Sequence, residues 1–205
     1  MTRSPFESSD WLHPDWPAPA NVRAVCTTRN GGTSSAPYDS LNLGTHVGDD
    51  ANVVAHNRSR LQQALCAQPV FFNQVHGTDL LALSPGTPDG ATADGVVTRE
   101  RGLACTIMVA DCLPVLLCDV QGTQVAALHA GWRGLAGIGG VGILENALKP
   151  FTPLAPVEYP DNAIEVIAWL GPCIVQEAFE VGADVVDAFT RTYPAAATCV
   201  PPFAK

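Results

Sequence analysis

Short apolar runs separated by polar or glycine-containing turns fill the middle of the chain. Their length and their richness in valine, isoleucine and leucine predict β-strands. The runs cover residues 70–75, 80–83, 95–98, 103–110, 115–119 and 124–129. Because they are almost continuously apolar, we expect strands that are buried on both faces. Gln121-Gly122-Thr123 separates the last two runs and is short enough to form a hairpin turn.

A helical period replaces this pattern at residues 51–65. The positions that recur at helical spacing are Val53, Val54, Asn57, Leu61 and Leu65. Asp49 or Asp50 precedes them and can cap the first turn. Glycine-rich residues 131–142 lead into a second expected helix that ends near residues 149–150, and a third is expected at about 183–191.

The remaining segments complete the predicted fold. Four prolines within residues 1–21 interrupt regular structure and predict an N-terminal tail. Residues 22–28 and 164–170 read as strands, and a proline-rich loop runs to residue 161. Together the elements predict an α/β (α+β) fold of mixed β-sheets covered by helices, with residues 22–205 forming a single domain.

Composition narrows the class of partner. The 205 residues are 47% hydrophobic and 15% charged, which is typical of a folded globular protein. The net charge of −9 and the scattered lysines and arginines disfavour nucleic acid and anionic membranes, so a small molecule is the expected partner. The N-terminus has no apolar signal region, and the seven cysteines mostly lie inside apolar runs. We therefore expect reduced thiols and a cytoplasmic protein.

Three short motifs place a reactive side chain at the end of an apolar run, beside small residues or a proline. They are NQVHG at residues 73–77, ADCLP at 110–114 and HAGWRG at 129–134. Their reactive residues His76, Cys112 and His129 supply two imidazoles and one thiolate, a competent set of zinc ligands with a fourth position left for water or substrate. The alternative for each histidine alone is an ordinary structural role.

Other chemistries use the same residues. In a metal-free cysteine hydrolase or amidase, Cys112 would be the nucleophile and His129 its base, with the amides of residues 131–134 stabilising an oxyanion. A single copper ion with Met108 as axial ligand also fits the ligand types. A four-copper oxidase does not, because the chain has five histidines and no HxH pair. A non-catalytic binding protein is a further alternative.

These motifs, together with TTRNGG at residues 27–32, SLNLG at 40–44 and FEVG at 179–182, resemble the YfiH-like family, whose members have been labelled laccase-domain proteins, polyphenol oxidases and purine nucleoside phosphorylases. The resemblance runs from about residue 20 to the C-terminus. It implies that residues 22–205 form a single catalytic domain of two packed mixed β-sheets covered by helices, in α/β/β/α layers similar to the fold of a cysteine-dependent toxin deamidase. It also implies zinc ligands at His76, Cys112 and His129. It also implies a C-terminal segment, resembling FFSYRRD, that we expect this chain to lack.

The activity implied by the resemblance is zinc-dependent phosphorolysis of adenosine, inosine, guanosine and methylthioadenosine, with adenosine deamination as a second reaction. The substrates would then be a nucleoside and phosphate. Some relatives are linked instead to editing of peptidoglycan precursors, which is amide hydrolysis. Phosphorolysis needs an anion clamp, for which Arg58 and Arg133 are the candidates. Asn42 and His46 are candidates for contacting the ribose or base, with an ordinary turn residue as the alternative for Asn42. Asp111 is a candidate for orienting a ligand histidine in the catalytic centre, with the cap of a turn as the alternative.

Overall fold

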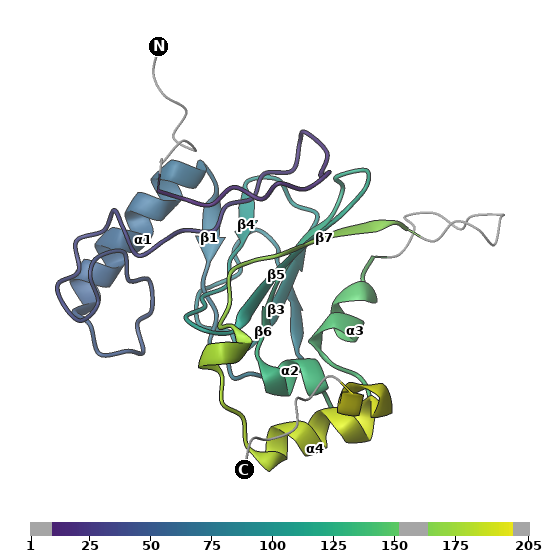
Figure 1. Ribbon diagram of the computed structural model, residues 1–205. Helices are drawn as coiled ribbons and strands as arrows, with labels where there is room; N and C mark the ends of the chain where they lie inside the picture. The colour runs from purple at the N-terminus through teal and green to yellow at the C-terminus, as the bar shows by residue number, and fades with distance from the viewer. Residues whose placement is uncertain (1–9, 152–163, 199–205) are drawn as a thin grey trace.

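A five-stranded mixed sheet forms the centre of the computed structural model, which describes residues 10–151 and 164–198 (Figure 1). In spatial order its strands are β2 (Leu80–Ala82), β3 (Gly95–Thr98), β6 (Val125–Ala130), β5 (Leu113–Asp119) and β7 (Val166–Leu170). The pair β2–β3 is parallel and the other pairs are antiparallel. A second sheet consists of the parallel pair β1 (Gln68–Val70) and β4 (Leu103–Cys105).

Helices lie on both sides of the two sheets. Helix α1 (Ala51–Leu65) packs on β1, while α2 (Trp132–Ala136) and α3 (Ile143–Leu148) pack on β6 at the opposite side (Figure 1). Helix α4 (Ala183–Thr192) packs against α2, and the short 3₁₀ helices η1 (Gln176–Ala178) and η2 (Pro194–Thr198) flank it in sequence. The predicted α/β class with two sheets and helices is confirmed. No helix among the described residues is long and apolar enough to span a bilayer.

Side-chain alternation along the central strands builds two cores. Val97 and Leu128 face α3 and pack with Ile143, whereas Val96 and Ala127 face the small sheet and pack with Val70 of β1 and residues of β4. Because strand side chains alternate between faces, each central strand contributes to both clusters. The prediction of strands buried on both faces is confirmed for β3, β5 and β6.

Several predicted elements differ in extent. The helix at residues 51–65 is confirmed at both ends, with Asp50 as its cap. Residues 22–28 do not form the predicted strand. Within the described chain, the only bridge of that segment joins Cys26 to Leu12, and a strand needs a neighbour along its whole length. The runs at 70–75 and 103–110 stay in strand conformation only as far as Val70 and Cys105, the last residues of the β1–β4 pair. Most of the predicted proline-rich loop lies outside the described residues.

Helix α2 was not predicted, because Gly131 and Gly134 disfavour a helix in its sequence. The Gln121-Gly122-Thr123 turn does join two antiparallel strands, β5 and β6, as predicted.

A buried asparagine on α1 fixes the long loop that precedes the helix. Asn57 is fully buried, and its amide nitrogen donates to the Ser34 hydroxyl and to the carbonyls of Ser40 and Asn42, at 2.9 to 3.2 Å. Its amide oxygen accepts from the backbone N–H of Thr33 at 3.0 Å. One side chain therefore holds residues 33–42 against the helix.

We expect Asn57→Ala to lower the free energy of unfolding by about 3 kcal/mol, because it leaves several buried polar groups without partners. Urea unfolding measures the change. Asn52→Ala is the matched control, since Asn52 is exposed on the same helix and its loss should cost less than about 0.5 kcal/mol. Equal effects of the two substitutions would contradict the assigned role of Asn57.

Candidate metal centre

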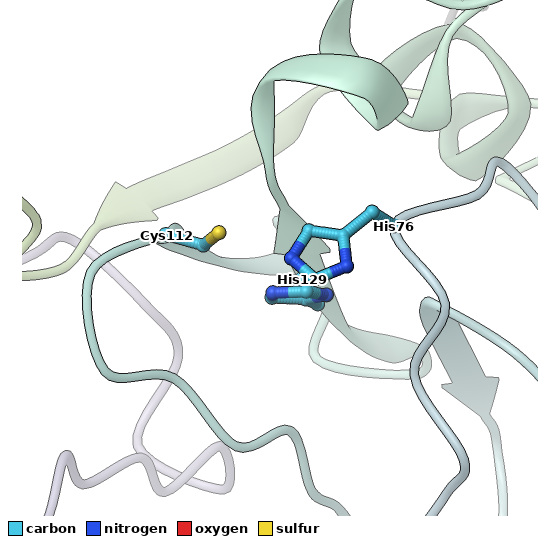
Figure 2. Close-up of side chains that lie close together, drawn as sticks. All are labelled: His76, Cys112 and His129. Carbon is cyan, nitrogen blue, oxygen red and sulfur yellow. The ribbon is translucent and has the colours of Figure 1, made fainter. Parts of the chain in front are cut away.

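The three predicted ligands come from separate segments and meet at one end of the large sheet. His76 lies in the loop between β1 and β2, Cys112 immediately precedes β5, and His129 is near the end of β6. One ligand atom from each of the three lies within 4.8 Å of the others. Figure 2 shows the sulfur of Cys112 pointing toward the two imidazole rings. The rings of His76 and His129 meet edge to face with centroids 4.7 Å apart.

Asp94 orients the buried ring of His129. The Oδ1 atom of Asp94 lies 2.8 Å from Nδ1 of His129, and the Asp94 backbone carbonyl accepts from the His129 N–H at 2.7 Å. Asp94 is 1% exposed and His129 is 4% exposed, so water does not compete for this contact. Because Nδ1 is bound to the carboxylate, Nε2 of His129 is the nitrogen that remains for a metal ion.

The same carboxylate holds the loop that carries His76. The backbone N–H groups of Val75, His76 and Gly77 donate to the two Asp94 oxygens at 3.1, 2.8 and 2.7 Å. His76 has a φ of +61°, a left-handed conformation that is unfavourable for a residue with a Cβ. Burial alone would raise the pKa of Asp94, but the hydrogen bonds from His129 and the three amides outweigh it and lower that pKa.

The pKa shifts of the other two proposed ligands, His76 and Cys112, favour the binding of a metal cation. Burial, followed by the nearby charge of His129, lowers the pKa of His76, so its imidazole is neutral and can bind a metal at neutral pH. Burial raises the pKa of the Cys112 thiol, and the carboxylates of Asp111 and Asp94 raise it further. A thiolate at this position is therefore unfavourable until a positive charge arrives to stabilise it.

Glycine at position 131 permits the close packing of the ligands. A Cβ at this position would lie 2.7 Å from Cδ2 of His76 and 3.1 Å from Sγ of Cys112. Any larger residue would push at least one ligand away from the cluster. The first glycine of the HAGWRG motif, Gly131, is therefore required by the close approach of His76 and Cys112.

The three ligands open into a cleft of about 1550 Å³, large enough for a nucleoside-sized molecule. The same cleft is lined by Asp111, Asn42 and His46 among the predicted site residues. Asp111 and His46 are exposed. The Asn42 side chain is used within its own loop, where its amide nitrogen donates to Asp49 at 3.0 Å and its amide oxygen accepts from the Gly44 N–H at 3.0 Å.

The two candidate arginines are outside the residues that line this cleft. Arg58 faces a separate hollow of about 320 Å³, where it donates to the Leu43 carbonyl at 2.9 Å, pairs with Asp89 at 3.2 Å and stacks on Phe71. Arg133 is exposed on α2, with its guanidinium 4.2 Å from the centroid of the Trp132 ring. Its charge is close enough to lower the pKa of His76. Of the two arginines, Arg133 is therefore the one whose charge acts on a proposed metal ligand.

Sequence reasoning missed the carboxylate that orients the ligands. Asp111 was expected to hold a ligand histidine, but Asp94 occupies that position, and the Asp111 backbone carbonyl accepts from Ile174 instead. The available signal was an acidic residue between Ala93 and Gly95, directly before a fully buried strand. A charge in such a place needs several hydrogen-bond partners.

The chain is similar to a known protein family and to several named proteins. A family model described as multi-copper polyphenol oxidoreductase laccase matches residues 23–204. The chain is 48% identical to a purine nucleoside phosphorylase of Pseudomonas aeruginosa over 195 residues, which cover 95% of this chain and 75% of the relative. It is 47% identical to purine nucleoside phosphorylase YfiH of Escherichia coli over 183 residues, which cover 88% of this chain and 70% of the relative.

Two solved structures are similar in fold. A crystal structure of a Neisseria meningitidis protein of the DUF152 family is 46% identical, with a TM-score of 0.81 over 96% of this chain and 76% of that protein. YlmD from Geobacillus stearothermophilus is 30% identical, with a TM-score of 0.73 over 97% of this chain and 73% of that protein.

We expect Asp94→Asn to lower the free energy of unfolding of the metal-free protein by about 3 kcal/mol, because an amide cannot accept all four hydrogen bonds. The folded pKa of Asp94 is below its unfolded value, so its contribution is present at neutral pH and is lost as the pH falls through the folded pKa. The difference between variant and wild type should therefore shrink in acid.

Urea unfolding with a chelator, at neutral and acid pH, measures this effect. Asp79→Asn is the control, because Asp79 is an exposed carboxylate of the same loop and its replacement should change stability by less than about 0.5 kcal/mol. A difference for Asp94→Asn that stayed constant with pH would show that the ionised carboxylate is not the stabilising group.

Proposed function

Because the chain belongs to the YfiH-like, laccase-domain family, we propose that it is a zinc-dependent purine nucleoside phosphorylase with adenosine deaminase activity as a second reaction. The observation that carries the proposal is the His76, Cys112 and His129 cluster at the wall of a cleft that is large enough for a nucleoside. The proposed substrates are adenosine, inosine, guanosine or methylthioadenosine together with phosphate, in keeping with the names of the relatives.

The donor set fits zinc. Ligand atoms around a tetrahedral zinc ion are about 3.3 to 3.8 Å apart, given bond lengths of about 2.1 Å to nitrogen and 2.3 Å to sulfur. The cluster within 4.8 Å therefore needs only a small inward movement of its side chains. When bound, zinc supplies a redox-inert Lewis acid at the wall of the cleft.

The remaining residues bind and orient the substrates. We assign the phosphate to Arg133, because its guanidinium is exposed beside the ligand-bearing segments, whereas the Arg58 guanidinium is already bound to Leu43, Asp89 and Phe71. His46 is exposed on the cleft wall and is available to contact the ribose or base. Asn42 shapes that wall through its hydrogen bonds within the loop. Asp111 contributes a carboxylate at the cleft, next to Cys112.

The alternatives that use Cys112 differently have less support. A metal-free cysteine hydrolase needs a thiolate, and burial together with two nearby carboxylates raises the pKa of Cys112. A multi-copper oxidase needs many more histidines than the five in this chain. A single copper ion remains compatible with the ligand types, and Met108 lines the same cleft. Metal analysis separates copper from zinc directly.

A reducing compartment suits this chemistry. All six cysteines in the described part of the chain are free thiols; Cys199 lies outside it. A free thiol at position 112 is required for metal binding, and in an oxidising compartment this thiol could be oxidised to a disulfide or a sulfenic acid. We therefore place the enzyme in the cytoplasm, with small molecules rather than nucleic acid or membranes as partners.

We expect purified protein to contain about one zinc ion per chain, and His76→Ala to lose most of it, because removing a ligand from a three-residue site sharply weakens binding. Metal content by mass spectrometry, after purification with zinc and without chelator, tests this. His56→Ala is the control, since His56 is exposed on α1 and away from the cluster. Zinc retained in full by His76→Ala would contradict the ligand assignment, and copper in its place would reassign the metal.

We expect adenosine to be converted to adenine and ribose 1-phosphate only when phosphate is present. Cys112→Ala should lower this rate by roughly 100-fold or more, because a Lewis acid contributes several kcal/mol of transition-state stabilisation. Chromatography of the products, with and without phosphate, separates adenine from the inosine that deamination would form. Cys173→Ala, at an exposed thiol, should keep wild-type activity. Full activity in Cys112→Ala would refute the proposed centre.

A further inference from the structure

The segment that leads to Cys112 has little regular structure of its own. Strand β4 ends at Cys105 and β5 begins at Leu113, so the intervening residues lack a strand partner. Among the described residues, three hydrogen bonds join residues 107–111 to distant parts of the chain. One runs from the Ile174 N–H to the Asp111 carbonyl at 2.9 Å. The other two involve Gln74.

The Gln74 side chain pairs with both backbone groups of Met108. Its Nε2 donates to the Met108 carbonyl at 2.7 Å, and its Oε1 accepts from the Met108 N–H at 2.8 Å. The side-chain amide thus satisfies both backbone groups of one residue, as a neighbouring strand would. Gln74 is two residues before His76, and Met108 is four residues before Cys112. The contact therefore connects the segments of two proposed ligands.

We infer that Gln74 is a positioning residue for Cys112. The inference rests on the proposed metal centre and deepens it. The three ligand-bearing segments are joined pairwise by three separate interactions. Asp94 joins the His76 loop to His129. The β5–β6 ladder, which pairs Pro114 with His129, joins the Cys112 end of β5 to the third ligand. Gln74 joins the remaining pair.

Only an amide of this length fits both bonds. A carboxylate at position 74 would accept from the Met108 N–H but would place a second oxygen against the Met108 carbonyl. A methionine has nearly the same length and packs similarly, but it cannot form either hydrogen bond. Without them, residues 107–111 keep one hydrogen bond to a distant part of the described chain, the one from Ile174, and the Cys112 segment loses its direct hydrogen-bonded connection to the His76 segment.

Cobalt titration of the metal-free protein tests the inference, because a thiolate–cobalt charge-transfer band reports Cys112 and the ligand-field bands report the whole site. In Gln74→Met we expect the dissociation constant for cobalt to rise about tenfold or more and the charge-transfer absorbance per bound cobalt to fall. Hydrogen exchange at the Met108 amide should accelerate. Gln63→Met, at an exposed glutamine of α1, is the matched control and should behave as wild type.

A second variant guards against misfolding of the first. Gln74→Glu keeps the acceptor for the Met108 N–H but places an oxygen against the Met108 carbonyl, so its dissociation constant for cobalt should also rise above that of the wild type. Wild-type affinity and charge-transfer absorbance in either variant would overturn the role of Gln74. If the wild-type protein itself takes up neither cobalt nor zinc, the metal centre fails, and the positioning role fails with it; the wild-type titration therefore separates the two failures.

Discussion

A single buried carboxylate organises the candidate site. Asp94 is almost fully buried and accepts hydrogen bonds from three consecutive amides of the His76 loop and from the His129 ring. A buried charge is costly unless it is fully hydrogen-bonded, so the folded state depends on this loop being in place. In return the four donors fix two of the three ligands, including the left-handed backbone at His76, which would otherwise be unfavourable. Stability and ligand geometry thus depend on the same contact.

The environment of the ligands is arranged for a positive charge. Three carboxyl or thiol groups, Asp94, Asp111 and Cys112, lie near two histidines, and the pKa of the Cys112 thiol is raised while that of His76 is lowered. A metal ion would relieve the repulsion between the thiolate and the carboxylates, and the neutral imidazole of His76 binds it without first losing a proton. Arg133 adds a positive charge outside the ligand set, which suits an anionic co-substrate better than it suits the ligands.

Part of the cleft wall is shaped by α1 and the loop that precedes it rather than by the sheets. Asn57 holds residues 33–42 on the helix, and Arg58, one position later, binds the Leu43 carbonyl and stacks on Phe71. Adjacent helix residues point in different directions, so one helix can fix the loop at two points. Asn42 and His46 therefore reach the cleft on a loop whose shape is set by polar contacts at its back. The predicted binding residues divide accordingly: the side chains of Asn42 and Arg58 are engaged in holding the loop, while those of His46 and Arg133 stay accessible.

Local patterns in the sequence were sufficient for the elements whose causes are local. The helical period and the Asp50 cap predicted α1 at both ends, β3 was predicted residue for residue, and the short turn predicted the β5–β6 hairpin. The grouping of His76, Cys112 and His129 also matches the prediction, which rested on two things: each residue stands beside a small residue or a proline at the end of an apolar run, and the motifs resemble the YfiH-like family. Tertiary structure decided the rest. Residues 22–28 lack a partner strand, Arg58 is occupied by Asp89 and Phe71, and Asp94 rather than Asp111 reaches His129. The Gln74 contact with Met108 spans 34 positions. Contacts between side chains so far apart in the sequence depend on how the sheets and loops pack, and a local sequence pattern does not determine that packing.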